Sequence, residues 1–210
     1  MRMLVTAGPT REHLDDVRFL SNASTGAMGI AVAVAATRRG HSVVLVLGPT
    51  HLEPPKGIET ERVVSAKQMY EVVHHHYVGA DAVVMTAAVC DYRPEVRVAG
   101  KMKKTSDDMT LKLAANPDIL ASLGRVKARR VLVGFALEPV RQGAREHAME
   151  KMRKKNLDFI VLDNPEAMAA ERVSAVILSA DGAEEELTDA PKRRIAERII
   201  DLIEQKAKRD

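Results

Sequence analysis

The sequence predicts an α/β fold: a single Rossmann-like, doubly wound, mostly parallel sheet with helices on both faces and a small antiparallel edge. Two observations predict it. Short apolar segments rich in valine and isoleucine alternate with segments of helical period, and no internal repeat or low-complexity linker interrupts the alternation. At 210 residues the chain is long enough for one sizeable core and short for two average domains. We therefore predict one domain over residues 1–210.

The predicted elements follow from the composition of each segment and from the turn and cap residues that bound it. Apolar runs typical of strands buried on both faces cover residues 4–7, 42–48, 82–88, 131–136 and 159–162. Segments of helical period cover residues 26–39, 66–78, 117–123, 140–155 and 190–208, and a glycine follows each of the first three. Asn116 is the expected cap of the third helix, with Pro117 in its first turn. An Asp-Gly turn signal between residues 174–179 and 184–187 predicts the antiparallel edge.

Composition restricts the classes of function. The 32 basic residues are nearly balanced by 29 acidic ones and only 3% of residues are aromatic, which argues against nucleic acid and favours a small anionic ligand. The single cysteine excludes an internal disulfide and a multi-thiolate metal site, as expected in a reducing cytoplasm. Neither a signal peptide nor an apolar run of membrane-spanning length is present, so we expect a cytoplasmic protein without a membrane partner.

The strongest local signal is residues 5–29, VTAGPTREHLDDVRFLSNASTGAMG. A strand ends at Gly8, a polar loop follows, and a helix begins among small residues whose first-turn N–H groups are free to bind an anion. The glycine spacing of a dinucleotide fingerprint and of a P-loop is absent. The second strand ends Leu47-Gly48-Pro49 where a nicotinamide-linked or flavin-linked reductase would need an acidic residue. These residues therefore indicate a nucleotide site of another kind.

Together with five later blocks, this segment resembles phosphopantothenoylcysteine synthetase, also called phosphopantothenate cysteine ligase, a family on the route from pantothenate to coenzyme A. The blocks are residues 86–93 (TAAVCDYR), 101–104 (KMKK), 116–120 (NPDIL), 133–136 (VGFA) and 151–161 (KMRKKNLDFIV). The resemblance is good from about residue 4 to 161 and loose beyond. It implies Mg²⁺-assisted ligation of 4'-phosphopantothenate to L-cysteine through an acyl nucleotide, with CTP favoured over ATP as the co-substrate.

The resemblance also implies roles for individual residues. Asn22 is expected to hold the acyl nucleotide with Arg18 as a second contact, and Lys101 to serve the attack by cysteine. The other expected nucleotide contacts are Gly8, Met85, Thr86, Ala87, Asp91, Pro117, Asp118, Ile119, Leu120, Phe135, Lys151 and Lys155; the expected substrate contacts are Asn22, Ser24, Gly26 and Ala88. The metal ligands stay undetermined.

Each of these roles has a plainer alternative. Asn22 is also placed to cap a helix, and Lys101 belongs to a run of charges of the kind that is usually solvated. Lys151 and Lys155 lie on one helix face, which is either a phosphate site or a basic surface. Residues 92–108 show no period and are expected to form a mobile lid that carries Lys101.

Two further features bear on chemistry. The consecutive histidines at 74–76 point about 100° apart on a helix, so they cannot converge on one metal ion and are expected on a partly exposed helical face. Cys90 is expected to be a buried small residue, because no base motif accompanies it.

The resemblance finally implies partners and leaves one alternative open. The family is typically dimeric, so a homodimer is expected, and a separate flavin-dependent decarboxylase is a candidate partner because no flavin domain is expected in this chain. Ala27 stands where the family usually has lysine in the sequence S-S-G-K-M-G. The alternative is therefore a degenerate nucleotide-binding paralogue, or a non-catalytic partner of that decarboxylase.

Overall fold

The computed structural model describes residues 1–104, 108–138, 143–164 and 170–209, and it is built on one eight-stranded sheet. In spatial order the strands are β12 (Glu184–Pro191), β11 (Arg172–Ser179), β10 (Phe159–Asp163), β9 (Val131–Leu137), β6 (Ala82–Met85), β1 (Arg2–Ala7), β4 (Ser42–Leu47) and β5 (Glu59–Arg62). The strands from β10 to β5 pair in parallel, and β11 and β12 add an antiparallel edge. The predicted mostly parallel sheet with an antiparallel margin is confirmed.

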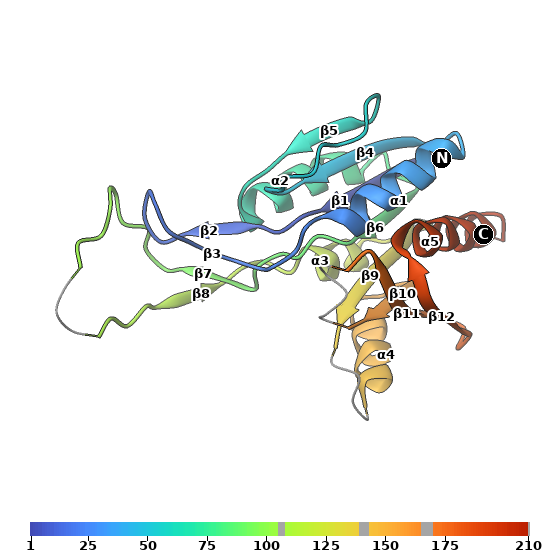
Figure 1. The fold of residues 1–210 in the computed structure, drawn as a ribbon. Coiled ribbons are helices and arrows are strands. Elements are labelled where there is room, and N and C mark those ends of the chain that lie inside the picture. The colour runs from blue at the N-terminus through green and yellow to red at the C-terminus, as the bar shows by residue number, and fades with distance from the viewer. Residues whose placement is uncertain (105–107, 139–142, 165–169, 210) are drawn as a thin grey trace.

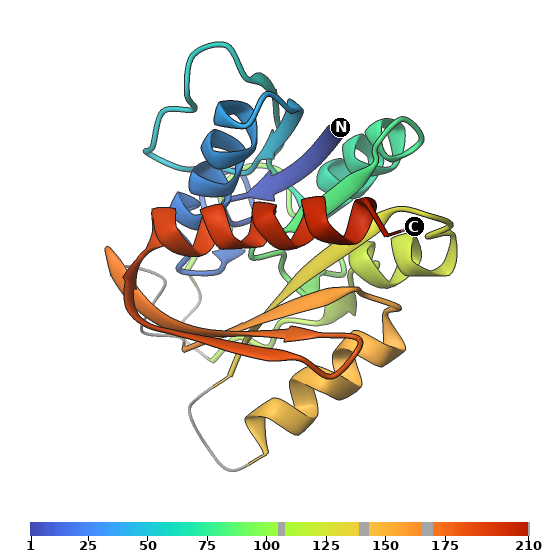
Figure 2. The ribbon, with the colours of Figure 1, turned by 90° about the vertical axis from the view of Figure 1, so that its right-hand side faces the viewer.

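Helices cover both faces of the sheet (Figure 2). One face carries α1 (Ala27–Arg38) and α5 (Lys192–Ala207), and the other carries α2 (Ala66–Tyr77), α3 (Ile119–Arg125) and α4 (Ala144–Lys154). The strand side chains alternate between two cores, because successive residues of a strand point to opposite faces. Among the described residues, no helix is long and apolar enough to cross a membrane.

Most predicted elements are present, with shifted ends. The edge strand β5 was not predicted, because its sequence Glu-Thr-Glu-Arg is polar and largely exposed. The last helix begins at Lys192 and not at residue 190, because the two preceding residues still belong to β12. The fourth helix is described from Ala144; residues 140–142 of its predicted start lie outside the described residues.

The start of α3 differs from the prediction. Its cap is Asp118, whose Oδ1 accepts a hydrogen bond from Ala121 N at 2.9 Å, whereas the Asn116 side chain donates to the Cys90 carbonyl at 2.9 Å. Gly124 lies inside the helix and does not end it. A Cβ there would lie 1.9 Å from the Lys155 carbonyl oxygen, so this glycine permits a close backbone contact.

An arm projects from the sheet, away from both chain termini (Figure 1). We define the arm as residues 11–21 and the described part of 92–115. It contains two small antiparallel sheets, β2 (Arg11–His13) with β3 (Phe19–Ser21) and β7 (Tyr92–Pro94) with β8 (Leu113–Ala115). The expected lid over 92–108 belongs to this arm; residues 105–107 lie outside the described residues.

Helix α1 approaches the sheet closely enough to require glycine at position 29. A Cβ there would lie 2.4 Å from Thr86 Oγ1 and 2.7 Å from the Thr6 carbonyl oxygen. The backbone of α1 therefore packs directly on the ends of β1 and β6.

We expect Gly29→Ala to destabilise the protein by about 1–3 kcal/mol, as overpacking does, although alanine normally stabilises a helix interior by about 1 kcal/mol relative to glycine. Gly79→Ala is the matched control, because its Cβ would approach only the flexible Arg2 side chain. Urea unfolding measures both; equal stability of the two variants would contradict the packing argument.

Candidate functional site

A cavity of about 400 Å³ lies at the carboxyl ends of β6, β9 and β10. Ligands of open α/β sheets bind at this edge, near the point where the strand order reverses. Fifteen of the predicted site residues line the cavity: Asn22, Ser24, Gly26, Met85, Thr86, Ala87, Ala88, Asp91, Pro117, Asp118, Ile119, Leu120, Phe135, Lys151 and Lys155. The fold therefore gathers blocks that are up to 133 residues apart in the sequence.

Three predicted residues do not line this cavity. Gly8 lies beneath it, where its carbonyl accepts a hydrogen bond from Ala88 N at 3.0 Å and its φ of 79° favours glycine. Arg18 and Lys101 lie on the arm, and their side chains do not contribute to the cavity wall. Within one chain, the structure brings Asn22 together with the nucleotide blocks but not with Lys101.

The Asn22 side chain is fixed to the other wall of the cavity. Its Nδ2 donates to the Ala88 carbonyl at 3.0 Å. It does not cap α1, whose N-cap is Gly26 without any side-chain cap bond. The alternative of a helix cap is therefore wrong, and the second amide N–H and Oδ1 make no hydrogen bond within the described part of the chain.

The floor of the cavity is held by two threonines. The Thr86 hydroxyl donates to the Thr6 carbonyl, and Ala87 N donates to Thr6 Oγ1 at 3.1 Å. Thr6 is fully buried, so these bonds form away from water. They turn the chain out of β6 and point residues 86–88 along the cavity.

The cations Lys151 and Lys155 approach the cavity from the end of α4. Lys151 Nζ donates to the Phe135 carbonyl at 3.2 Å, and Lys155 Nζ pairs with Asp118 Oδ2 at 2.6 Å. Burial, and then the neighbouring charge of Lys155, lower the pKa of Lys151 below its usual value. Burial alone would raise the pKa of Asp118, but the hydrogen bonds from Lys155 and Ala121 N and the charges of the two lysines together outweigh burial, and the net shift is downward. This corner of the cavity thus brings two lysines and one carboxylate together.

Sequence reasoning missed two ionisable residues of the cavity, Asp163 and Lys192. Burial raises the pKa of Asp163 and lowers that of Lys192, and the opposite charge of each partner moderates the effect. Asp163 directly follows a predicted strand, which is a signal that could have found it. Lys192 begins α5 and belongs to no motif. The other unpredicted lining residues are Thr25, Ala27, Met28, Gly29, Val89, Cys90, Asn116 and Leu137.

Residues 1–207 match the family model of the DNA/pantothenate metabolism flavoprotein C-terminal domain. The chain belongs to this family. The coenzyme A biosynthesis bifunctional protein CoaBC of Bacillus subtilis (strain 168) is 41% identical over 206 residues, which cover 96% of this chain and 50% of the relative. The protein of the same name from Mycobacterium tuberculosis (strain ATCC 25618 / H37Rv) is 38% identical over 215 residues, covering 96% of this chain and 51% of the relative. The chain thus spans about half the length of these relatives.

The fold of the family agrees with the fold described above. The crystal structure of the C-terminal domain of coenzyme A biosynthesis bifunctional protein CoaBC has a TM-score of 0.86 to this chain at 38% identity. The match covers 100% of this chain and 96% of that one. The Rossmann-like arrangement is therefore shared over the whole domain.

Cys90 lies in the cavity wall but is not built as a nucleophile. The residue is buried, its thiol donates weakly to the Thr10 carbonyl at 3.6 Å, and burial raises its pKa. A thiol with a raised pKa carries little thiolate at neutral pH. The expectation of a buried small residue is confirmed.

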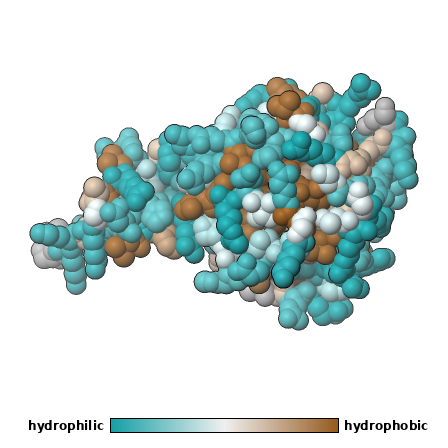
Figure 3. Space-filling view, turned by 90° about the horizontal axis from the view of Figure 1, so that it is seen from above, coloured by the Kyte–Doolittle hydropathy of each residue, from teal (hydrophilic) through white to brown (hydrophobic). Residues whose placement is uncertain are grey.

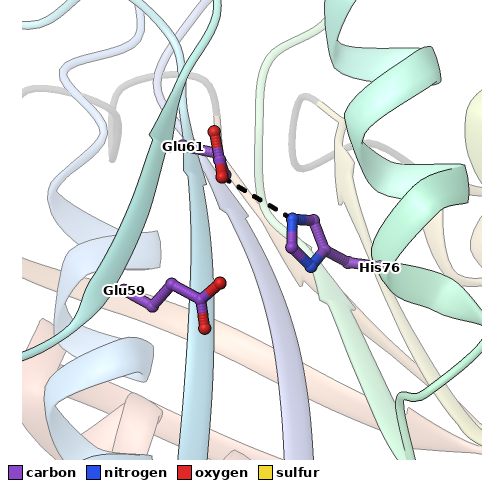
Figure 4. A group of neighbouring side chains, drawn as sticks. All are labelled: Glu59, Glu61 and His76. Carbon is purple, nitrogen blue, oxygen red and sulfur yellow. Dashed lines mark ion pairs between the residues drawn. The ribbon is translucent and has the colours of Figure 1, made fainter.

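A second cluster of titratable groups lies away from the cavity, where Glu59 and Glu61 of β5 face His76 of α2 (Figure 4). Their ligand atoms lie within 4.8 Å of one another, and His76 is buried, although the three histidines were expected on a partly exposed face. The Arg2 guanidinium lies 3.3 Å from His76 Nδ1. A metal-binding imidazole normally donates this second ring N–H to an acceptor, which a guanidinium cannot be. We therefore assign this cluster no metal.

We expect a triphosphate to bind this cavity more weakly as the pH rises toward the usual lysine pKa of about 10.4. The reason is that Lys151, with its lowered pKa, loses its charge at a lower pH than an ordinary lysine does. Calorimetric titration with a nucleoside triphosphate measures the affinity at each pH. Lys151→Arg should flatten the profile, because arginine stays charged, and Lys67→Arg on the exposed face of α2 is the control. Parallel profiles for all three proteins would rule out Lys151 as the cause.

Proposed function

We propose that this chain catalyses the nucleotide-dependent ligation of 4'-phosphopantothenate to L-cysteine in coenzyme A biosynthesis. The observation that carries the proposal is the convergence of Asn22, residues 85–91, residues 116–120 and the lysine pair on one cavity. The family supports it, since curated relatives of this chain are coenzyme A biosynthesis bifunctional proteins. Because the chain spans half of these relatives, the assignment of the ligation step to this half is part of the proposal.

In the first step, a carboxylate oxygen of phosphopantothenate attacks the α-phosphorus of the nucleotide, and the bond to the β-phosphate oxygen breaks. Pyrophosphate leaves with the electron pair and an acyl nucleotide remains. Lys151 and Lys155 would bind the phosphates, and the first-turn N–H groups of α1 would stabilise negative charge. Asn22, held by Ala88, would present its remaining amide N–H to the acyl nucleotide.

In the second step, the cysteine amine attacks the acyl carbon, and the bond to the nucleotide oxygen breaks. The nucleoside monophosphate leaves with the electron pair, the new bond is the amide, and the amine proton passes to solvent. Lys101 would offset the charge that develops on the leaving phosphate. Lys101 does not line the cavity of its own chain. Its side chain would therefore reach the leaving phosphate only if the arm packed against a cavity.

The donor set of the cavity fits Mg²⁺, which prefers carboxylate oxygens together with substrate phosphates. Asp91 and Asp163 line the cavity, and a dication there would oppose the burial that raises the pKa of Asp163. When bound, the ion would neutralise charge on the phosphates. We favour CTP over ATP as the nucleotide, a preference supported only by the resemblance of the sequence blocks.

We also propose that residues 1–210 form one domain that acts as a cytoplasmic homodimer, with a separate decarboxylase as a candidate partner. The support for the dimer is the arm. Two-stranded sheets are marginally stable by themselves, and the arm exposes apolar side chains among polar ones (Figure 3). The exposed apolar residues of the arm are Val17, Phe19, Tyr92, Val96, Val98, Met109, Leu111 and Leu113. A second copy would cover them and bring Lys101 to the boundary between subunits.

The deciding experiment is pyrophosphate release by the purified protein with Mg²⁺, phosphopantothenate and CTP or ATP, with and without cysteine. We expect release that depends on phosphopantothenate. Asn22→Asp and Lys101→Gln should each reduce product formation by about 10²–10³, as loss of one stabilising donor does. Asn22→Asp also sets a carboxylate against the Ala88 carbonyl, which repels it.

Lys67→Gln, on the exposed face of α2, is the control and should leave turnover unchanged. Nucleotide binding without any pyrophosphate release would refute the ligase and favour the degenerate binding paralogue, for which the missing lysine at Ala27 is the support.

We expect light scattering to give twice the mass of the 23.0 kDa chain. Val96→Glu should shift the protein toward monomer, because Val96 is 73% exposed on the arm and would be covered in the dimer. Val78→Glu is the matched control: this valine is 79% exposed but lies at the end of α2, away from the arm. A monomeric wild-type protein, or equal effects of both variants, would contradict the dimer.

A further inference from the structure

Lys101 lies in a stretch of chain that is clamped by hydrogen bonds on both of its sides. On the preceding side, Gly100 N donates to Asp16 Oδ2 at 2.8 Å, and Asp16 N donates to the Gly100 carbonyl at 3.1 Å. On the following side, Met102 N donates to Asp15 Oδ2 at 3.0 Å, and Arg18 Nη2 donates to the Met102 carbonyl at 3.0 Å. The Lys101 side chain between them is exposed. The backbone of this lysine is therefore fixed while its side chain is presented to solvent.

All the groups that form the clamp come from one short turn, residues 15–18. Asp15 is fully buried, and its carboxylate accepts from Val17 N at 2.8 Å, Arg18 N at 2.6 Å and Arg18 Nε at 2.9 Å, besides Met102 N. The same carboxylate thus orients the Arg18 side chain and fixes the backbone of Met102, the residue that follows Lys101. Asp16 instead pairs with Arg97 Nη2 at 2.9 Å and with Gly100, and makes no bond to Arg18 that the described contacts include.

Both carboxylates are suited to hold the clamp at neutral pH. The hydrogen bonds from Arg18 hold the pKa of Asp15 well below its usual range, and the bond from Arg97 lowers that of Asp16. A group with a lowered folded-state pKa contributes stability above its unfolded pKa and loses it only in acid. Both carboxylates are therefore ionised, and the clamp intact, at neutral pH.

We propose that Asp15 and Asp16 are positioning residues that hold Lys101 and Arg18 as one unit, and that Asp16 acts through Lys101 alone. The proposal rests on the proposed function. It follows that the backbone on both sides of Lys101 is anchored to the turn at residues 15–18. Misplacement of a reacting group by about 1 Å can cost about 10²-fold in rate, so two backbone anchors around one lysine matter for turnover.

The test is a double-mutant cycle of Asp16→Ala and Lys101→Gln, read in two separate half-reactions. Pyrophosphate release without cysteine reports the first step, and amide formation after cysteine is added reports the second. We expect Asp16→Ala to slow the second step by about tenfold or more and to leave the first within about twofold. In the Lys101→Gln background, Asp16→Ala should have no further effect on the second step, because groups that act through one another are not additive.

Two variants separate positioning from general loss of structure. Asp16→Asn keeps an acceptor for Gly100 N and should recover part of the rate lost in Asp16→Ala. Asp181→Ala is the matched control, because its carboxylate also accepts a backbone N–H, from Ala183 at 3.2 Å, but lies in the edge hairpin. It should leave both steps unchanged.

Several results would overturn the proposal: an unchanged second step in Asp16→Ala, equal slowing of both steps, or additive effects in the double variant. A wild-type protein that releases no pyrophosphate would instead defeat the proposed function. The clamp is then judged by amide hydrogen exchange, in which Asp16→Ala should speed exchange at Gly100 at least about tenfold. Unchanged exchange there would refute the clamp by itself.

Discussion

The structure depends on a contact between backbones at the carboxyl end of β1. Gly8, Gly26 and Gly29 let the loop after β1 and the first turn of α1 touch without intervening side chains: a Cβ on Gly26 would lie 3.1 Å from Gly8 N, and one on Gly29 2.4 Å from Thr86 Oγ1. This approach brings the first turn of α1, residues 27–29, to the cavity. The same contact sets residues 86–88 opposite Asn22, whose amide then reaches the Ala88 carbonyl. In a dinucleotide-binding fold, closely spaced glycines in one loop allow such a close backbone approach. In this chain the glycines are distributed over the loop after β1 and the first turn of α1, so the G-x-G-x-x-G spacing is not needed.

The arm is held by a different kind of interaction. Its two small sheets contribute almost nothing to the two apolar cores, and charged side chains fix it instead. The Asp15 carboxylate accepts hydrogen bonds from both segments of the arm: from the Arg18 guanidinium in residues 11–21 and from Met102 N in residues 92–115. Because Asp15 is fully buried, each of these bonds is stronger than it would be at the surface. Removal of this carboxylate would leave several partly buried donors without their acceptor. The geometry of Arg18 and of the lysine segment thus depends on one ionised group.

The sequence was sufficient for the parallel strands and the edge hairpin, because buried strands carry continuous apolar runs and the Asp-Gly turn is a strong local signal. It was not sufficient for β5 or for the arm, whose strands are short, polar and stabilised by partners distant in the chain. The sequence predicted Asn116 as the N-cap of α3, but the cap is the next polar residue, Asp118. Both residue types are good N-caps. Only a tertiary contact distinguishes them, because the Asn116 side chain donates to the Cys90 carbonyl instead. Residues 85–91 and 116–120 line one cavity, as their positions after strands indicate, whereas Lys192 was not foreseen because a single charge at a helix start has no pattern.

The division of cations between cavity and arm has an electrostatic reason. Lys151 and Lys155 already share one partly buried corner, where burial and mutual repulsion lower the pKa of Lys151. A third lysine placed there permanently would lower the pKa of Lys151 further and so reduce the charge available for phosphate. On the arm, Lys101 stays exposed and keeps its hydration until a ligand or a second chain approaches. The hydrogen bonds at Gly100 and Met102 already order the backbone around Lys101. Binding therefore costs less conformational entropy than it would if Lys101 lay on a long flexible loop. In the proposed reaction, an exposed side chain on a fixed backbone would therefore supply a cation to the second step without weakening the nucleotide site.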